Sequence, residues 1–250
     1  MLEEKFQEFE KYANKFDMNE EAIKRKFDHS YRVAKYANEI AKSMNLNESD
    51  VYLATLIGLL HDIGRFNQWK IYKTYVDGDS YDHALLGVEV LKENNFIKKF
   101  EKDTVNQEII LKAIYYHNKL AIDENLDERT KLHAKIIRDA DKLDIMMTQG
   151  TEVIKSDYLV GEELIKSIKE HRQCRNQYVQ TKIDHVARML CFIFDLNFKY
   201  SLKFVKEQNF IENKLKIMKD YLPDGVDEKS LKEEFYNYIN KLIIKLIKYI

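Results

Sequence analysis

The sequence reads Leu59-Leu60-His61-Asp62-Ile63-Gly64-Arg65-Phe66 at its most informative point. Apolar residues recur at helical spacing over 51–60, and Ser49, followed by Asp50, suits the N-terminal cap of that helix. We expect the helix to end at Gly64, because glycine is a common helix stop. A helix this apolar is buried, and a buried His-Asp pair is costly unless both side chains have partners. The stretch therefore predicts a buried polar site at the end of a core helix.

The composition predicts an all-α fold. The 250 residues include 7 Gly and 1 Pro, where average usage gives roughly 30. Sandwiches, barrels and propellers need many tight turns, and tight turns need these two residues. With 45% hydrophobic and 12% aromatic residues, the chain is apolar enough to form a core.

Helical periodicity continues along the whole chain, and we expect one helical domain over residues 1–250. A subdomain boundary near Gly150 is left open. The clearest loop is 75–80, around Asp77-Gly78-Asp79. The expected helices cover residues 3–15, 17 or 19 to 43, 49–64, 82–93, 106–117, 128–147, 162–168, 182–206, 210–221 and 229–249.

Charge and cysteine content exclude several classes of protein. The chain has 41 Lys+Arg against 42 Asp+Glu, so it lacks the basic excess of a nucleic-acid binder. The two cysteines, Cys174 and Cys191, form no CxxC pair, which excludes a disulfide scaffold and a Cys-based zinc finger. The charged N-terminus is not that of a signal peptide, and the longest apolar run is far below the ~18 residues of a membrane span. We therefore expect a cytoplasmic protein without a membrane segment.

Two further polar residues lie on apolar helix faces. His29 is in the middle of a helix near Phe27 and Val33, and Asp141 has the apolar helical neighbours Ile137 and Ile145. Imidazole and carboxylate groups bind divalent transition metals, and separate helices of a bundle can each contribute one ligand. A buried cluster of two histidines and two aspartates is hard to explain without a cation.

The pattern His29, His61-Asp62 and Asp141 resembles the HD-domain superfamily of metal-dependent phosphohydrolases. The resemblance covers about residues 28–144, and its most specific part is 60–66. It implies an HD-domain-like helical bundle with a metal-binding core at 19–147, and C-terminal helices at 150–250 that pack on the core. It also implies that His29, His61, Asp62 and Asp141 bind one metal.

His83 and His117 match an extended version of the same pattern. In HD proteins with two metals, histidines at such positions hold the second ion, and the aspartate of the His-Asp pair, here Asp62, bridges. The resemblance thus implies one or two divalent ions per chain, with Mn, Fe, Co, Ni and Zn all candidates. Cyclic-di-GMP phosphodiesterases of the superfamily carry a Gly-Tyr-Pro signature, which is absent because the single proline is Pro223.

Our hypothesis for the mechanism is attack of a metal-bound hydroxide on phosphorus. Asp62 would be a catalytic residue as well as a ligand, and Arg65 would grip a phosphate with its planar guanidinium. Lys142, Arg32 and Lys119 are further phosphate-binding candidates. Asp82 and Asp144 are candidates for orienting ligand histidines, and we interpret His133 as a packing or surface residue.

The expected substrate is a small phosphate ester, with nucleotides and cyclic nucleotides among the candidates. Two alternatives stay open. Some proteins with the same six-ligand HD pattern are mixed-valent diiron oxygenases, and a degenerate module would bind a nucleotide without turnover. We expect no nucleic-acid or membrane partner, and a homo-oligomer is left open.

Overall fold

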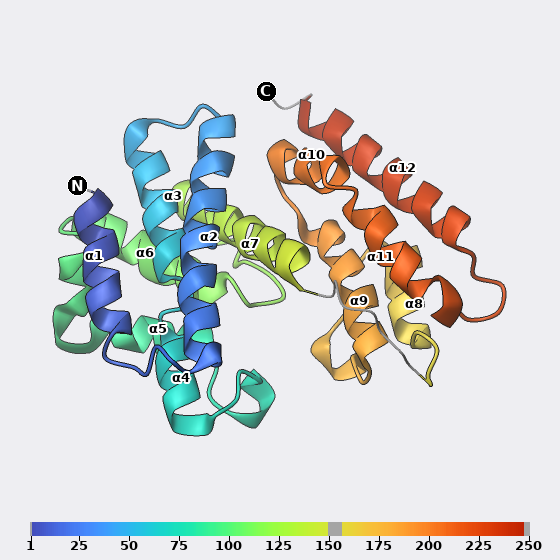
Figure 1. Ribbon diagram of the computed structural model, residues 1–250. Coiled ribbons are helices and arrows are strands. Elements are labelled where there is room, and N and C mark those ends of the chain that lie inside the picture. The colour runs from blue at the N-terminus through green and yellow to red at the C-terminus, as the bar shows by residue number, and fades with distance from the viewer. Residues whose placement is uncertain (1, 150–156, 248–250) are drawn as a thin grey trace. The chain divides into compact units, whose positions relative to one another are not determined.

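The computed structural model describes residues 2–149 and 157–247 (Figure 1). Within these ranges every regular element is a helix, which confirms the predicted all-α fold. The chain divides into two compact units, Met1–Asp144 and Ile145–Ile250, and the division falls inside helix α7 (Glu128–Thr148). Gly150 lies outside the described residues. The packing of the C-terminal helices on the core stays a prediction.

The first unit contains all of the proposed metal ligands. Helices α2 and α3 pack against each other, α4 packs on α5, and α5 on α6. Its elements before α7 are α1 (Leu2–Ala13), α2 (Glu21–Ser43), α3 (Glu48–Leu60), α4 (Gly64–Tyr72), the 3-10 turn η1 (Asp77–Asp79), α5 (His83–Lys92), η2 (Glu93–Lys99) and α6 (Thr104–Tyr116).

Helix α3 forms the centre of this unit. Every residue from Leu53 to Leu60 is buried, as expected for a helix that is apolar on all sides. Burial of each Leu or Ile side chain contributes about 1.5–3 kcal/mol, so α3 is held firmly in the core. The two residues that follow it, His61 and Asp62, are therefore fixed deep inside the unit, 0% and 2% exposed.

Side-chain caps fix where the site-bearing helices begin. Asn47, not the expected Ser49, caps α3, and its side chain accepts a hydrogen bond from the backbone N–H of Asp50 at 2.9 Å. Asp82 caps α5 by accepting from the backbone N–H groups of residues 84 and 85, each at 3.0 Å. This cap makes His83 the first residue of α5.

Gly64 has a different role from the helix stop that we expected. Helix α3 ends at Leu60, and Gly64 is the first residue of α4, a helix that the sequence analysis did not predict. A Cβ on Gly64 would lie 2.4 Å from the carbonyl oxygen of His83 and 2.5 Å from the backbone nitrogen of Gly87. Glycine is thus needed here because the backbones of α4 and α5 touch.

The second unit is a separate group of helices. Within it, α9 packs on α8 and α11, and α12 packs on α10 and α11. Its elements are α8 (Glu162–Lys169), η3 (Asn176–Tyr178), α9 (Lys182–Cys191), η4 (Phe192–Asp195), α10 (Lys199–Glu207), α11 (Phe210–Met218), η5 (Lys219–Tyr221) and α12 (Glu228–Ile247). The expected last helix, 229–249, extends beyond the described residues.

The single helix expected over 182–206 is wrong. The structure breaks it after Asp195, where Leu196 has extended backbone angles and the side-chain amide of Asn197 donates to the carbonyl oxygen of Asp195 at 2.8 Å. Such local side-chain bonds compete with helix formation. Leu196 and Phe198 are buried, so the apolar pattern runs through the break and concealed it.

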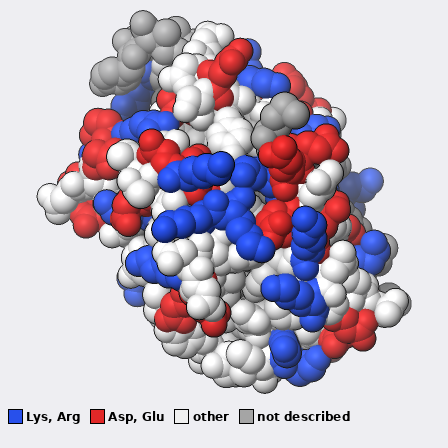
Figure 2. Space-filling model, turned by 90° about the vertical axis from the view of Figure 1, so that its left-hand side faces the viewer, with Lys and Arg blue, Asp and Glu red and all other residues white. Residues whose placement is uncertain are grey.

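The outer surface shown in Figure 2 carries both signs of charge, with Lys and Arg side chains in the centre and Asp and Glu side chains around them. This mixture agrees with the near-zero net charge of the whole sequence. No helix in the described ranges is both long and apolar enough to cross a membrane.

Candidate metal centre

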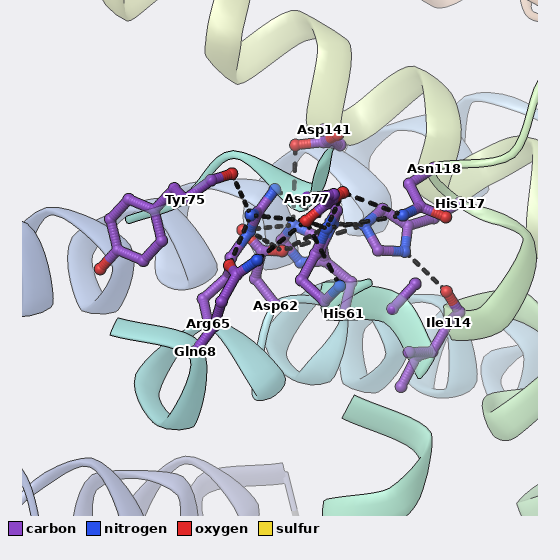
Figure 3. A network of polar contacts seen from close by, with 12 residues as sticks. His61, Asp62, Arg65, Gln68, Tyr75, Asp77, Ile114, His117, Asn118 and Asp141 are labelled. Atoms are coloured by element: carbon purple, nitrogen blue, oxygen red, sulfur yellow. Dashed lines mark hydrogen bonds and ion pairs between the residues drawn. The ribbon is translucent and has the colours of Figure 1, made fainter. Parts of the chain in front are cut away.

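Six side chains from separate parts of the first unit converge on one buried point. Figure 3 labels His61, Asp62, His117 and Asp141 among them. The six come from the middle of α2, the end of α3, the start of α5, the end of α6 and the C-terminal half of α7. All are buried except the aspartate on α7, whose side chain is 18% exposed. These residues are His29, His61, Asp62, His83, His117 and Asp141, the same six that the sequence analysis singled out.

The first group of donor atoms lies between α2, α3 and α7. The Nε2 atoms of His29 and His61 are 3.2 Å apart. Asp141 Oδ1 lies 3.1 Å from His29 Nε2 and 3.6 Å from His61 Nε2. Two imidazoles and a carboxylate at these separations are suited to hold one divalent ion.

The second group of donor atoms lies between α5 and α6. The Nε2 atoms of His83 and His117 are 3.0 Å apart, and both side chains are buried. Asp62 Oδ1 lies 3.5 Å from His83 Nε2 and 3.9 Å from His117 Nε2. This arrangement is suited to hold a second ion.

Asp62 faces both groups, one with each carboxylate oxygen. Its Oδ2 atom lies 3.5 Å from His29 Nε2 and 3.6 Å from His61 Nε2, on the side opposite to the contacts of Oδ1. With an ion in each group, Asp62 would be placed to bridge them.

In each of the four converging histidines, the ring nitrogen that points away from the site has an acceptor. His61 Nδ1 donates to the carbonyl oxygen of Gly58 at 2.8 Å, and His117 Nδ1 donates to that of Ile114 at 2.6 Å. Because a carbonyl only accepts, Nδ1 carries the proton in both rings and Nε2 of the neutral ring has a lone pair. His29 Nδ1 bonds Asp144 Oδ2 at 2.6 Å in the same way.

His83 completes this pattern through a residue that the sequence analysis missed. Its Nδ1 lies 2.7 Å from Oδ2 of Asp77, in the loop between α4 and α5. We expected Asp82 in this role, and that expectation is wrong, because Asp82 caps α5 and pairs with Lys119. Asp144, the other expected orienting residue, does bond His29.

The electrostatics keep the second histidine pair neutral. Burial lowers the pKa of His117 to about 3, and burial together with Arg65 lowers the pKa of His83. With both Nδ1 atoms protonated and both rings neutral, two Nε2 lone pairs face each other at 3.0 Å. Such a contact is repulsive unless positive charge lies beside it; the Arg65 NH2 group lies 3.3 Å from His83 Nε2, and a bound ion would reach both nitrogens. The donor set therefore fits a metal ion.

The two carboxylates are ionised. Burial alone would raise the pKa of Asp62, but Lys26, His61 and Arg65 outweigh burial and hold the pKa well below its usual range. Contacts with His29 and His61 outweigh burial in the same way and lower the pKa of Asp141. A metal ion thus meets anionic oxygens as well as imidazole nitrogens.

His29 differs from the other histidines. Burial and Lys26 disfavour its charged form, yet the contacts with Asp141 and Asp144 outweigh them and raise its pKa. A proton is therefore the natural competitor of a metal ion at His29 Nε2.

Arg65 is largely committed to protein partners. Its NH1 group donates to Gln68 Oε1, to the carbonyl oxygen of Tyr75 and to Asp77 Oδ1, at 2.7, 2.7 and 3.2 Å. Its Nε atom is buried, lies 3.5 Å from Asp62 Oδ1 and has no hydrogen-bond partner among the described residues. Arg65 holds the loop between α4 and α5 against the site, its NH2 group lies 3.3 Å from His83 Nε2, and its Nε donor is left without an acceptor.

The other cationic candidates also have protein partners. Arg32 Nε donates to Asp144 at 2.6 Å, and the side chain of Lys142 is buried with Nζ 3.5 Å from the carbonyl oxygen of Arg138. Lys26, which the sequence analysis missed, has Nζ 2.7 Å from Asp62 Oδ2. Its position in the sequence could have predicted this contact, because Lys26 lies three residues before His29 and residues three apart share a helix face.

His133 is buried rather than on the surface. Its Nε2 lies 3.0 Å from Asp50 Oδ1, and its Nδ1 has no hydrogen-bond partner in the described part of the chain. It belongs to a structural contact between α3 and α7.

Comparison with known proteins adds one finding. The family model of the HD domain matches residues 27–146, a range that contains all six converging residues. The curated proteins and the solved structures gave no match.

Proposed function

Because residues 27–146 belong to the HD-domain family, a superfamily of metal-dependent phosphohydrolases, we propose that this protein hydrolyses a small phosphate ester. Nucleotides and cyclic nucleotides are the candidate substrates. The observation that carries the proposal is the contact of the His83 and His117 Nε2 atoms at 3.0 Å, since two neutral imidazoles in this arrangement favour a cation that both nitrogens reach, and Arg65 NH2 contacts only His83.

Two divalent ions would bind at the two groups of donor atoms. His29, His61 and Asp141 would hold one ion, His83 and His117 the other, and Asp62 would bridge. Ions bound there would neutralise phosphoryl oxygens and lower the pKa of a coordinated water. Asp144 and Asp77 keep the rings of His29 and His83 in the orientation that points Nε2 inward.

Cationic residues beside Asp62 would receive the phosphate. The unpartnered Nε donor of Arg65 faces the space near Asp62 Oδ1, and Lys26 Nζ lies on the Oδ2 side. Guanidinium and ammonium groups both bind phosphate oxygens. A role for Lys142 in catalysis stays a prediction.

We also propose that the protein works in the cytoplasm, because Cys174 and Cys191 are free and buried thiols.

The test is elemental analysis of the untagged protein, together with a hydrolysis assay on a panel of phosphate esters that includes nucleotides and a cyclic nucleotide. The variant is Asp62→Asn, which keeps the shape of the side chain and removes its charge. The matched control is Asp28→Asn, since Asp28 precedes His29 and its side chain is 44% exposed. We expect two metal equivalents and phosphate release in the wild type and in the control, and loss of both in Asp62→Asn.

Other results would contradict the proposal in distinct ways. Full turnover by Asp62→Asn would mean that the metal centre takes no part in the reaction. Retained iron with oxygen consumption and no phosphate release would favour the oxygenase alternative. Nucleotide binding with no product over hours would favour the non-catalytic module.

A further inference from the structure

Three cationic side chains surround one aromatic ring next to the metal centre. The cationic groups of Arg25, Lys26 and Arg65 lie 5.7, 5.5 and 5.5 Å from the centroid of the Tyr75 ring. Two of these residues are on α2 and one is on α4, while Tyr75 is in the loop before α5. We call these four residues the Tyr75 cluster.

Contacts on both sides hold the Tyr75 ring in place. Its hydroxyl donates to the carbonyl oxygen of Ala22 at 2.9 Å, and its own carbonyl oxygen accepts from Arg65. Figure 3 shows that carbonyl facing Arg65 while the ring points away from the converging ligands. Cation–π contacts are attractive, so the fixed ring helps to position the cationic groups around it.

The positive charges of the Tyr75 cluster are unevenly compensated. Arg65 has Asp62 and Asp77 within ion-pair distance, and Lys26 has Asp62 at 2.7 Å. Among the described residues, no carboxylate lies within ion-pair distance of Arg25. The compensation therefore decreases from the buried end of the cluster to its exposed end.

Metal binding would reduce this compensation further. Both oxygens of Asp62 face histidine pairs, so bound ions would take up the charge that Lys26 now uses. Lys26 and Arg25 would then form an adjacent pair of cationic groups without an anionic partner. Lys26 is 16% exposed at its side chain and Arg25 is exposed, so the pair leads from the metal centre to solvent.

We propose that Lys26 and Arg25 form a second phosphate subsite, and that the substrate carries at least two phosphate groups joined by an anhydride oxygen. This inference rests on the proposed function and extends it, because the bond that breaks is a phosphoanhydride rather than a phosphate ester. A substrate with one phosphate would place that group at the metal centre and leave Arg25 without a partner. A nucleoside diphosphate, a nucleoside triphosphate or a related polyphosphate would fill both positions.

The second subsite has a chemical consequence for hydrolysis. The oxygen of water forms a bond to the phosphorus at the metal centre, and the bond from that phosphorus to the anhydride oxygen breaks. The electron pair stays on the departing phosphate, which also takes up a proton released by the water. Lys26 and Arg25 lie where they stabilise the charge of this leaving group, and stabilisation of developing charge is commonly a large part of catalysis.

The experiment compares two probes on the metal-loaded protein by titration calorimetry. The probes are orthophosphate and imidodiphosphate, a diphosphate analogue with a nitrogen bridge that resists hydrolysis. The variant is Arg25→Gln. The control is Lys24→Gln, an exposed cation on the same helix whose partner is Asp28 at 3.8 Å.

We expect the wild type and Lys24→Gln to bind imidodiphosphate about tenfold more tightly than orthophosphate, as one charge-assisted hydrogen bond contributes on that order. Arg25→Gln should lose most of this preference and keep its affinity for orthophosphate. An equal preference in Arg25→Gln and Lys24→Gln would overturn the second subsite.

The two proposals fail in different ways. An Arg25-dependent preference in a protein that hydrolyses no phosphate compound would support the subsite and contradict the proposed function. Hydrolysis of phosphate esters by a protein without the preference for imidodiphosphate would support the proposed function and contradict the second subsite.

Discussion

Replacing Gly64 with alanine should damage the fold and the metal centre together. Gly64 begins α4, and its Cα faces the first turn of α5. An added Cβ would lie 2.4 Å from the carbonyl oxygen of His83 and 2.5 Å from the backbone nitrogen of Gly87. Both obstacles are backbone atoms, so a change of rotamer cannot relieve the clash.

The size of the effect follows from the distance that α5 has to move. Ordinary Cβ contacts are 3.4–4 Å, so relief requires a shift of about 1 Å. Overpacking of a filled core costs typically 1–3 kcal/mol, and a backbone shift belongs at the upper end. We expect Gly64→Ala to lower the free energy of unfolding by about 2–3 kcal/mol. Because His83 is the first residue of α5, the same shift would misplace a proposed ligand of the second ion.

The matched control is Gly87→Ala, on the opposite side of the same contact. There a Cβ would meet the backbone nitrogen of Gly64 at 3.5 Å and only side-chain atoms of neighbouring residues at similar distances. Gly87 is inside α5, where alanine is favoured over glycine by about 1 kcal/mol. Gly87→Ala should therefore be neutral or more stable than the wild type.

The assay is urea denaturation followed by tryptophan fluorescence, with metal content measured on the folded proteins. The single tryptophan, Trp69, is in α4 and reports on the relevant contact. Equal midpoints for Gly64→Ala and Gly87→Ala, with both metals retained, would refute the close-approach argument.

Three more predictions concern particular contacts. Asp144→Asn should weaken metal binding about 10–100-fold, because His29 loses an ionised acceptor; competition with a fluorescent chelator measures this, and unchanged affinity would contradict it. Burial lowers the pKa of His133, and its bond to Asp50 restores it only in part, so below pH 6.5 the unfolded chain binds a proton that the folded chain does not. The wild type should therefore lose more stability than His133→Gln between pH 7 and pH 5, as urea titrations at both values would show. Thr181→Ala should cost about 1 kcal/mol, since Thr181 and Asp184 form a capping box at the start of α9, and a melting temperature equal to that of the wild type would count against this role.

The sequence predicted well those features that depend on local composition and on residue type. The scarcity of Gly and Pro indicated helices, and the all-α fold is confirmed. Four of the six candidate ligands stood out as polar residues in an apolar setting, and His83 and His117 were added by the resemblance to the HD pattern. The structure brings the donor atoms of all six together. Their binding of metal stays a prediction.

What the sequence did not predict depends on contacts between distant segments. Asp77 is in a loop without periodicity, so nothing in the pattern linked it to His83. Gly64 was interpreted from its local propensity to end helices, whereas its actual role comes from the approach of α5. Arg65 was assigned to phosphate because of its type, but three acceptors that it contacts were invisible before the loop had a position.

The way in which the histidines are oriented affects how the site would tolerate mutation. In each pair, one ring is held by a main-chain carbonyl, that of Gly58 or Ile114, which no substitution can delete. The other ring in each pair depends on a carboxylate side chain, Asp144 or Asp77, which a single base change can remove. Loss of either carboxylate would loosen one ring in one pair and leave the other pair intact. Loss of an orienting carboxylate would therefore weaken the binding of one ion at a time, whereas loss of Asp62, which faces both pairs, would affect both ions in a single step.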